Sequence, residues 1–217
     1  MKYDKFIQIS CDGGAATGKS TGAKMISKKY KLRFLSSGLL YRYAGYLILK
    51  FKPKNKIGFL RKKFKKLNYN KLSKINLHTQ EISNYSAVIA KENKIRKILK
   101  IFQINFSKKN KNCCIEGRDI STKILPNSDL KFFFKCNLNI AAKRRYKELK
   151  KSNTKIKLKD VKKSLKIRNI LDTKRKNSPL LKHRDSVEID TGKLSKQAML
   201  AKMSKYVEKI LNIKYGI

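Results

Sequence analysis

The sequence predicts an α/β domain built on a five-stranded parallel sheet with helices on both faces. Three observations support this class: a length of 217 residues, which suits one domain, five apolar runs bounded by polar turns, and helix-like segments between those runs. The strands are expected near residues 5–10, 32–35, 112–116, 130–136 and 186–190. The helices are expected near 19–30, 38–50, 80–107, 139–151, 158–176 and 195–212. Parallel sheets of this kind bind their ligands outside the carboxyl ends of the strands.

The first strand, Phe6 to Cys11, is followed by a segment that reads GGAATGKS at residues 13–20. This segment matches the pattern G-x-x-x-x-G-K-[ST], and a helix is expected directly after it. Glycines let successive N–H groups point at one anion, and the helix N-terminus adds a favourable dipole. We expect Lys19 to reach the β- and γ-phosphates of a nucleoside triphosphate and the Ser20 hydroxyl to bind Mg²⁺. The residues expected to contact this nucleotide are Gly13, Gly14, Ala15, Ala16, Thr17, Gly18, Lys19, Ser20 and Thr21.

The second strand is followed by the segment SSGLLYR at residues 36–42. Either Ser36 or Ser37 is expected to cap the helix that begins there. Arg42 stands one turn into this helix, from where its side chain could reach back over the strand ends. An exposed helix arginine is the alternative interpretation of Arg42.

Residues 51–79 interrupt the alternation of strands and helices. They contain Pro53, Gly58 and a lysine cluster at positions 62, 63, 65 and 66, with scattered apolar residues. We interpret this stretch as an inserted subdomain or a mobile flap within a single domain that spans residues 1–217. A nucleic-acid-binding patch is an alternative for the same stretch.

The third strand ends in Glu116-Gly117-Arg118-Asp119, directly after the apolar residues 113–115. An acid at the end of a strand next to a phosphate-binding loop is where a ligand for Mg²⁺ and its waters is needed. We therefore expect Glu116 to take part in metal binding together with Ser20. Arg118 offers a cation for phosphate, and Asp119 offers an acceptor for a base or a sugar. A plain acidic helix cap would also explain Asp119 taken alone.

Two later helices carry arginines in a chain whose basic residues are mostly lysine. Arg144 and Arg145 are adjacent in the helix after the fourth strand. In the next helix Arg168, Asp172 and Arg175 are spaced i, i+4 and i+7, so they are expected to share one face. We interpret residues from about 145 to 175 as a helical lid that closes over the triphosphate. An ordinary surface ladder of ion pairs is the alternative.

The charge of the chain is extreme. Lys and Arg number 56 against 14 Asp and Glu, a formal net charge of +42, and 46 of the 56 basic residues are Lys. Such an excess suggests attraction to polyanions. However, Lys, Asn and Ile are the residues that A/T-rich codons encode, so composition explains much of the charge. Arginine, the residue suited to bidentate phosphate contacts, numbers ten.

The remaining composition favours a cytoplasmic protein. Four cysteines show no metal-binding spacing, so buried free thiols in a reducing compartment are expected. His78 and His183 are too isolated to suggest a metal site. We find no signal peptide and no apolar run of the roughly 20 residues that a membrane span requires.

Taken in order, these segments resemble the cytidylate kinases, the bacterial type of nucleoside monophosphate kinase. The resemblance covers nearly the whole chain. It rests on the phosphate-binding loop led by Asp12-Gly13, on SSGLLYR at 36–42, EGRDI at 116–120, PNSDLKFF at 126–133, Arg144-Arg145-Tyr146, the Arg168 to Arg175 segment, Pro179-Leu180 and VEIDT at 187–191.

The resemblance implies transfer of the γ-phosphoryl group of ATP to CMP or dCMP in the presence of Mg²⁺, by a P-loop fold that acts as a monomer. The residues implied around the nucleoside monophosphate are Ser37, Arg42, Arg96, Arg118, Asp119, Arg168 and Asp172. Asp172 is implied at the pentose, and Arg118 and Asp119 near cytosine and phosphate. Arg42 and Arg96 are implied at the acceptor phosphate. The family serine that contacts cytosine falls near Ala87, with Ser86 one residue earlier.

The same resemblance assigns Lys19, Arg145 and Arg175 to catalysis, the two arginines as lid residues on the transferring group. It also identifies residues 51–79 with the subdomain that binds the monophosphate. Two alternatives stay open. One is a P-loop kinase of another nucleotide or of a small alcohol. The other is a lysine-rich P-loop protein that binds nucleic acid or serves in assembly, although no specific nucleic acid partner and no membrane are expected.

Overall fold

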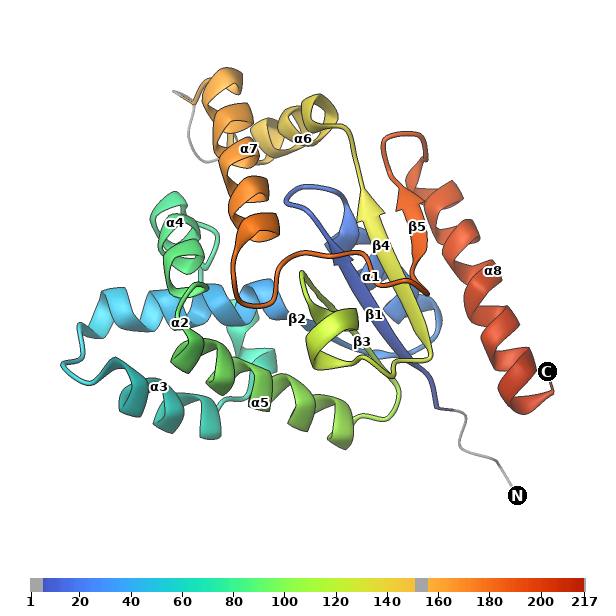
Figure 1. Ribbon diagram of the computed structural model, residues 1–217, viewed down its shortest axis with the longest axis horizontal. Helices are drawn as coiled ribbons and strands as arrows, with labels where there is room; N and C mark the ends of the chain where they lie inside the picture. Colours follow the sequence, from blue (N-terminus) through green and yellow to red (C-terminus); the bar gives the residue numbers. More distant parts are fainter. Residues whose placement is uncertain (1–5, 151–155, 217) are drawn as a thin grey trace. The chain divides into compact units, whose positions relative to one another are not determined.

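The computed structural model describes residues 6–150 and 156–216 and contains one five-stranded sheet (Figure 1). The strands are β1 (Gln8–Gly13), β2 (Arg33–Ser36), β3 (Cys113–Gly117), β4 (Leu130–Lys135) and β5 (Val187–Asp190), in the order β2-β3-β1-β4-β5. The pairings of β1 with β3, of β1 with β4 and of β4 with β5 are all parallel. The predicted α/β class with a five-stranded sheet is therefore confirmed. The chain divides into two compact units, residues 1–35 with 110–217, and residues 36–109.

Strand β1 begins and ends later than expected. The sequence predicts a strand near 5–10, of which residue 5 lies outside the described part, whereas the ladder runs from Gln8 to Gly13. The strand extends to Gly13 because β1 pairs with a neighbouring strand on each side: Asp12 lies opposite Gly117 of β3, and Gly13 lies opposite Phe134 of β4. The first glycine of the phosphate-binding pattern is thus the last residue of the strand. The loop leaves directly from the carboxyl end of a central strand.

The core of the first unit lies between the sheet and two helices, α1 (Lys19–Lys29) and α8 (Lys196–Tyr215). Phe132 and Phe134 of β4 are fully buried there, against Ile26 of α1 and Met203 of α8. Burying a large apolar side chain contributes roughly 1.5–3 kcal/mol relative to leaving it exposed. A Cβ atom at Gly22 would lie 2.7 Å from the Phe134 ring, so α1 approaches the sheet closely because it has a glycine there.

Two more helices of this unit are α6 (Leu138–Lys150) and α7 (Leu158–Lys174), which lie beyond the arrowheads of β1 and β4 in Figure 1. They share a small apolar cluster with the phosphate-binding loop, formed by Ala15, Ala141, Ala142, Val161 and Leu165. A single π-helical turn, η2 (Ile120–Ile124), follows β3. The predicted helix near 139–151 is therefore found, with residue 151 outside the described part. The predicted helix near 158–176 ends two residues early.

The second unit is helical. It contains α2 (Ser37–Phe51), α3 (Lys56–Lys65), the 3-10 helix η1 (Tyr69–Lys74), α4 (Gln80–Ile89) and α5 (Asn93–Lys109). Ser36 caps α2 by accepting a hydrogen bond from the Leu39 N–H, which decides between the two expected serines. Neither α3 nor η1 is predicted by the sequence, since Pro53 and Gly58 mask a short amphipathic pattern that buries Leu60 and Phe64. The assignment of 51–79 to monophosphate binding stays a prediction.

The single helix predicted over residues 80–107 is wrong, because α4 ends at Ile89 and α5 begins at Asn93. Along one continuous helix Ile89 and Ile95, six residues apart, would point about 120° away from each other. Both side chains are fully buried, so the chain must break between them. The interruption at residues 90–92 lets α4 and α5 take different orientations, so that the apolar face of each helix is buried.

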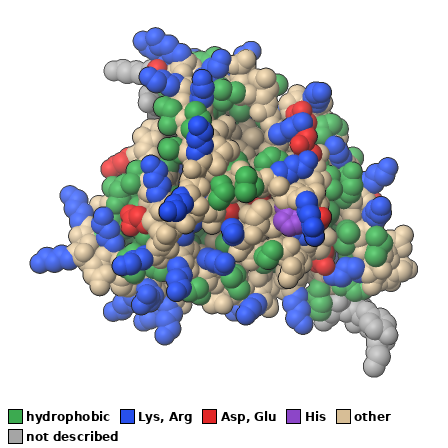
Figure 2. Space-filling model, in the orientation of Figure 1, with side chains coloured by type: hydrophobic (Ala, Val, Ile, Leu, Met, Phe, Trp, Pro, Cys, Tyr) green, Lys and Arg blue, Asp and Glu red, His purple; other side chains and the backbone are tan. Residues whose placement is uncertain are grey.

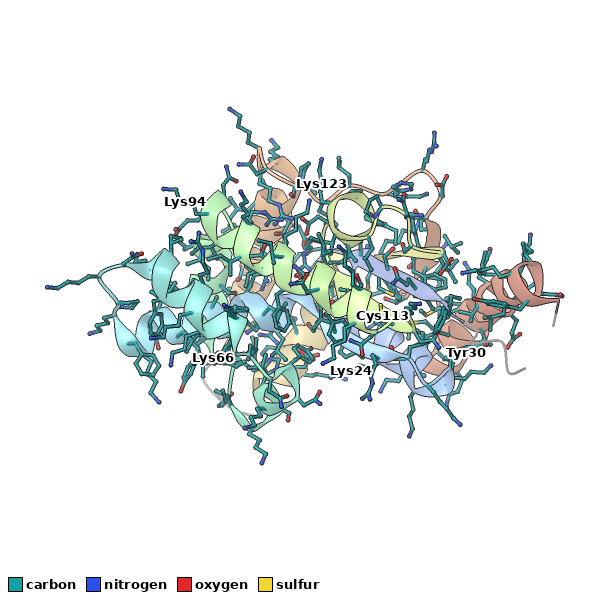
Figure 3. The ribbon with its side chains drawn as sticks, turned by 90° about the horizontal axis from the view of Figure 1, so that it is seen from below. Lys24, Tyr30, Lys66, Lys94, Cys113 and Lys123 are labelled. Atoms are coloured by element: carbon teal, nitrogen blue, oxygen red, sulfur yellow. The ribbon has the colours of Figure 1, made fainter. Side chains whose placement is uncertain are left out.

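The cysteines are free, as expected: Cys11, Cys113 and Cys114 are buried and Cys136 is half-buried. Burial raises the pKa of the Cys113 thiol to about 12, so this group stays protonated. Figure 3 shows lysine side chains, among them Lys66 and Lys94, pointing away from the ribbon. Within the described ranges, no helix combines the length and the apolar character that crossing a bilayer requires.

Candidate active site

The phosphate-binding loop connects β1 to α1 in a conformation set by close backbone contacts. A Cβ atom at Gly13 would overlap the carbonyl oxygen of Phe134 in the neighbouring strand, so only glycine fits there. Ala16 and Gly18 have positive φ angles of 58° and 80°, which curl the loop. The Thr17 hydroxyl donates to the Gly14 carbonyl at 3.0 Å, and the Thr191 hydroxyl donates to the Thr17 carbonyl at 2.8 Å. The loop is thus held from inside and from the end of β5.

Lys19, the first residue of α1, lies against a carboxylate at the end of β3. Its Nζ is 3.4 Å from Oε2 of Glu116, and both side chains are almost fully buried, at 9% and 4% exposure. Burial, followed by the charge of Arg118, lowers the pKa of Lys19 to about 8, although Glu116 acts in the opposite direction. The ammonium therefore stays charged at neutral pH in a place where an added anion would find little competing water.

Asp12 organises the turn that carries the predicted acidic and basic residues. Its fully buried carboxylate accepts hydrogen bonds from the N–H groups of Ile120 and Ser121 at 2.8 and 2.7 Å, and from the Ser121 hydroxyl at 2.6 Å. Burial raises the pKa of Asp12 and these hydrogen bonds lower it, with a net rise. Asp119 precedes η2 but makes no capping hydrogen bond with its side chain. Asp12, which the sequence analysis did not select, caps η2 in its place.

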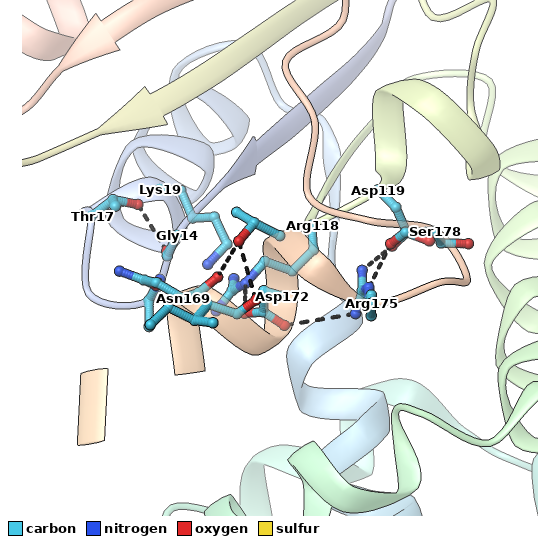
Figure 4. Close-up of polar contacts among 12 residues, drawn as sticks. Gly14, Thr17, Lys19, Arg118, Asp119, Asn169, Asp172, Arg175 and Ser178 are labelled. Atoms are coloured by element: carbon cyan, nitrogen blue, oxygen red, sulfur yellow. Dashed lines mark hydrogen bonds and ion pairs between the residues drawn. The ribbon is translucent and has the colours of Figure 1, made fainter. Parts of the chain in front are cut away.

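A cluster of two arginines and two aspartates lies beside this turn (Figure 4). Arg118 Nε lies 2.8 Å from Asp172 Oδ2, and Arg175 lies 3.7 Å from Asp172 Oδ1 and 3.8 Å from Asp119 Oδ1. Arg175 also donates to the carbonyl of Ser178. We call Arg118, Asp119, Asp172 and Arg175 the Arg–Asp cluster. Residues far apart in the chain meet there. The substrate roles expected for Arg118, Asp119 and Asp172 and the catalytic role expected for Arg175 stay predictions.

The neighbouring arginines determine the pKa of Asp172 in the Arg–Asp cluster. Burial by itself raises the pKa of Asp172, but the charge and hydrogen bond of Arg118, followed by the charges of Arg168 and Arg175, lower that pKa overall. Arg168 also acts on Lys19, where its charge lowers the pKa. Arg168 is therefore electrostatically close both to the cluster and to the phosphate-binding loop.

Arg175 does not belong to the helix face on which the sequence analysis placed it. Helix α7 ends at Lys174, and Arg175 has the extended angles φ −64° and ψ 136°. The chain turns here because the Leu180 N–H donates to the Asp172 carbonyl at 2.8 Å. The side chain still contacts Asp172, but from beyond the helix end rather than from the same face.

The two adjacent arginines of α6 have different partners. Arg144 donates to Oγ1 and to the carbonyl oxygen of Thr191, at 2.9 and 2.8 Å, so it supports the residue that holds the loop. Arg145 pairs with Glu148 of its own helix at 3.0 Å. The catalytic role expected for Arg145 stays a prediction, and the structural role of Arg144 was missed.

Helix α7 also contacts the loop directly, through a residue that the sequence analysis did not select. Oδ1 of Asn169 accepts a hydrogen bond from the N–H of Ala15 at 3.2 Å. Its place between Arg168 and Asp172, on a helix already suspected of covering the triphosphate, is the signal that could have identified it. Thr191, directly after the last strand, was likewise quoted in a motif but given no role.

Three predicted substrate residues lie in the second unit. Ser37 is buried at the start of α2. Arg42 donates to the Leu77 carbonyl at 3.1 Å and to the hydroxyl of Ser83. Arg96 donates to the Ala90 carbonyl at 3.2 Å, and its guanidinium lies 5.7 Å from the centre of the Tyr41 ring.

Ser83 and Ser86 lie on the same helix of that unit, α4, and both are buried. The Ser86 hydroxyl donates to the Ser83 carbonyl at 2.7 Å, while Ser83 is the residue that contacts Arg42. The serine beside a predicted substrate arginine is therefore Ser83, four residues before Ala87, the position that the resemblance suggested, and three before Ser86.

The predicted Mg²⁺ ligands fit a metal that binds together with a substrate. Ser20, the second residue of α1, is half-buried, and the Glu116 carboxylate is buried at the neighbouring strand end. Across residues 6–150 and 156–216 no three or more His, Cys, Asp or Glu side chains form a metal-binding group. One hydroxyl and one carboxylate suit Mg²⁺, which keeps several waters and is commonly shared with phosphate oxygens. Thr21, predicted at the nucleotide, is exposed.

The family model described as cytidylate kinase matches residues 9–209. The chain belongs to the cytidylate kinase family. Among its relatives is a cytidylate kinase from Bartonella tribocorum, 34% identical over 210 residues that cover 94% of this chain and 96% of that protein. One from Mesomycoplasma hyopneumoniae is 34% identical over 219 residues, 94% of each chain. One from Fusobacterium nucleatum is 33% identical over 221 residues, covering 94% and 98%.

Solved structures agree with the fold of this cytidylate kinase family member. A protein from Eubacterium ventriosum matches with a TM-score of 0.55 and 16% identity, covering 94% of this chain and 99% of its own. A protein from Thermus thermophilus matches with a TM-score of 0.53 and 13% identity, covering 95% and 98%. At these identities the likeness concerns the fold alone.

Proposed function

We propose that this chain transfers the γ-phosphoryl group of ATP to CMP or dCMP and releases ADP with CDP or dCDP. The observation that carries this proposal is the buried Lys19–Glu116 pair at the foot of the phosphate-binding loop, in the same unit as the Arg–Asp cluster. An anion-binding loop alone would suit any P-loop protein. Paired Arg and Asp side chains beside it suit an acceptor that has both a phosphate and hydroxyl or amino groups.

On the donor side, Lys19 and the backbone N–H groups of the loop hold the β- and γ-phosphates. The ammonium of Lys19 is already charged and buried at the start of α1, so side-chain movements suffice when the anion arrives. When bound, Mg²⁺ would neutralise charge on the phosphate oxygens, and Ser20 with Glu116 are the residues that would hold it. Binding of the phosphates would also draw Lys19 partly away from Glu116, which frees that carboxylate for the metal and its waters.

On the acceptor side, Arg118, Asp119, Arg168 and Asp172 are assigned to the nucleoside monophosphate. Asp172 can accept from the pentose hydroxyls, while Arg118 and Asp119 offer a donor and an acceptor to phosphate and cytosine. The family resemblance adds Ser37, Arg42 and Arg96 of the second unit. This part of the assignment rests on the order of the motifs and on the family to which the chain belongs.

Transfer itself needs alignment and charge neutralisation rather than covalent help from the protein. The bond between the γ-phosphorus and the bridging oxygen of ADP breaks as a bond to a phosphate oxygen of CMP forms. That acceptor oxygen is already ionised, so no general base is required. Arg175 and Arg145 are assigned to the equatorial oxygens of the transferring group, where an arginine can contribute roughly 10³–10⁵ in rate.

The test is ADP release from Mg·ATP in the presence of CMP, dCMP, UMP, AMP or dTMP, measured by a coupled assay. We expect turnover with CMP and dCMP that disappears in Lys19→Ala. Turnover with AMP or dTMP instead would transfer the assignment to another nucleotide. A protein that binds ATP but phosphorylates none of the five would contradict the proposal.

The alternative function, nucleic-acid binding, predicts that the lysines cluster on one surface of the protein. Figure 2 shows Lys and Arg side chains spread over the whole visible face, with hydrophobic and neutral surface between them. On this face the scatter favours composition as the source of the +42 charge rather than one built binding surface.

A further inference from the structure

The hydrogen bonds that side chains make to the phosphate-binding loop are of two kinds. Thr17 and Thr191 donate to the carbonyl oxygens of Gly14 and Thr17. A phosphate cannot use those carbonyls, because its oxygens are acceptors themselves. Asn169 does the opposite, since its Oδ1 accepts from the N–H of Ala15. Backbone N–H groups are the groups by which such a loop binds phosphate.

The Asn169 side chain is seated closely in the loop (Figure 4). In addition to the 3.2 Å bond from the Ala15 N–H, a Cβ atom built on Gly14 would lie 3.2 Å from Oδ1 and 3.7 Å from Cγ of Asn169. The amide therefore fills the space that the absent side chain of Gly14 leaves. Its carbonyl oxygen stands where a negatively charged oxygen would meet the same N–H.

Asn169 also connects the loop to the residues expected to contact the acceptor. It lies on α7 between Arg168, whose charge reaches Lys19, and Asp172, which is bonded to Arg118. Apolar contacts among Ala15, Val161 and Leu165 bring the same helix and loop together. A change at the Ala15 N–H is therefore transmitted to one helix that carries several site residues.

We propose that Asn169 is a positioning residue that latches α7 to the phosphate-binding loop and is displaced when the triphosphate binds. A phosphate oxygen is charged, and hydrogen bonds with an ionised acceptor are roughly twice as strong as neutral ones. ATP therefore outcompetes the amide for the Ala15 N–H. Its arrival frees α7, and with it Arg168 and Asp172, to adjust to the acceptor. This inference rests on the proposed use of the loop for ATP.

The proposed latch predicts whether substitutions of Asn169 strengthen or weaken the binding of ATP. Because the amide stabilises the nucleotide-free state, Asn169→Ala should bind ATP more tightly, by about two- to tenfold, the range that one neutral hydrogen bond contributes. Asn169→Asp should bind ATP at least about tenfold more weakly, since a carboxylate holds the N–H more strongly and repels phosphate. Ser164→Ala, an exposed neutral substitution on the same helix, is the matched control and should not change the affinity.

The experiment is isothermal titration of the full chain and its variants with the non-hydrolysable analogue AMP-PNP and Mg²⁺, together with thermal melts. Failure of the wild type to bind AMP-PNP would count against the proposed function and not against the latch alone. Given wild-type binding, tighter binding by Asn169→Ala with a lower melting temperature in the absence of nucleotide supports the latch. Equal or weaker binding by a folded Asn169→Ala variant, or unchanged binding by Asn169→Asp, overturns it.

Discussion

The phosphate-binding loop and the Arg–Asp cluster lie in the same unit but are stabilised by different forces. The loop is shaped by a glycine that no side chain could replace and by neutral hydrogen bonds from Thr17 and Thr191. The cluster consists of half-buried ion pairs in which Asp172 contacts both Arg118 and Arg175. Steric contacts and neutral bonds keep one shape, whereas ion pairs can exchange one anion for another. We infer that the backbone of the donor loop is preformed, with the Asn169 contact as the exchangeable part, and that the cluster re-pairs with its substrate.

The largest expected effect separates the two regions through catalysis. Arg175→Ala should lower turnover by about 10³ or more if, as we propose, Arg175 contacts the transferring group. Binding of AMP-PNP should stay within about twofold, because the hydrogen bonds that shape the loop come from Thr17, Thr191 and Asn169. Steady-state kinetics and titration give both values. Arg184→Ala, whose side chain is 91% exposed, is the matched control. Unimpaired turnover in Arg175→Ala would remove Arg175 from the transfer step.

The next effect tests the steric origin of the loop. Gly13→Ala should lower the free energy of unfolding by about 3 kcal/mol or more, because the new methyl group meets a backbone carbonyl that cannot move aside. Gly38→Ala is the control, since a Cβ atom there has the Ser36 hydroxyl 3.8 Å away as its nearest neighbour. Chemical denaturation measures both. A Gly13→Ala variant as stable as the wild type would show that the loop is not sterically constrained.

A smaller effect concerns the ionisation of Lys19, a loop residue whose pKa is also lowered by Arg118 of the Arg–Asp cluster. Its pKa is lowered to about 8, so the free protein loses this proton as the pH rises through 8. A bound triphosphate favours the charged ammonium, so binding should take up a proton near pH 8–9 and weaken by up to about tenfold per pH unit above 8. Calorimetry in buffers of different ionisation enthalpy measures the uptake. Lys19→Arg, charged throughout, should show none, and a pH-independent affinity in the wild type would argue against the shifted pKa.

The smallest effect concerns the neutral bonds of the loop. Thr191→Val removes a hydroxyl that donates to the Thr17 carbonyl and accepts from Arg144, and should lower the free energy of unfolding by about 1 kcal/mol. Thr122→Val is the matched control, because the Thr122 hydroxyl is buried without a hydrogen-bond partner in the structure and its loss should be neutral or stabilising. Thermal melts suffice to compare the two. Equal changes in melting temperature for Thr191→Val and Thr122→Val would mean that the hydrogen bonds of Thr191 do not stabilise the loop.

Much of the fold could be predicted because local patterns were strong. Four of the five strands begin within one residue of their expected positions, since continuous apolar runs bounded by polar turns are reliable signals for buried strands. The helix predicted at 80–107 failed because both halves are amphipathic, and only the shared core required Ile89 and Ile95 to face the same interior. The helix over Lys56–Lys65 was missed because its apolar signal is short and interrupted by Gly58.

The sequence by itself determined the family, the chemistry of the loop and the residue types at the strand ends, because these depend on contiguous motifs. The tertiary structure decided how separate motifs combine: which serine caps α2, that Asp12 holds the turn after β3, that Arg175 contacts Asp172 from beyond the helix end, and that Asn169 reaches Ala15. The physical reason is that hydrogen bonds and ion pairs need side chains within 3 to 4 Å. Asp12 and Ser121, like Ala15 and Asn169, are more than a hundred positions apart, and they come within that distance only once the fold has brought them together.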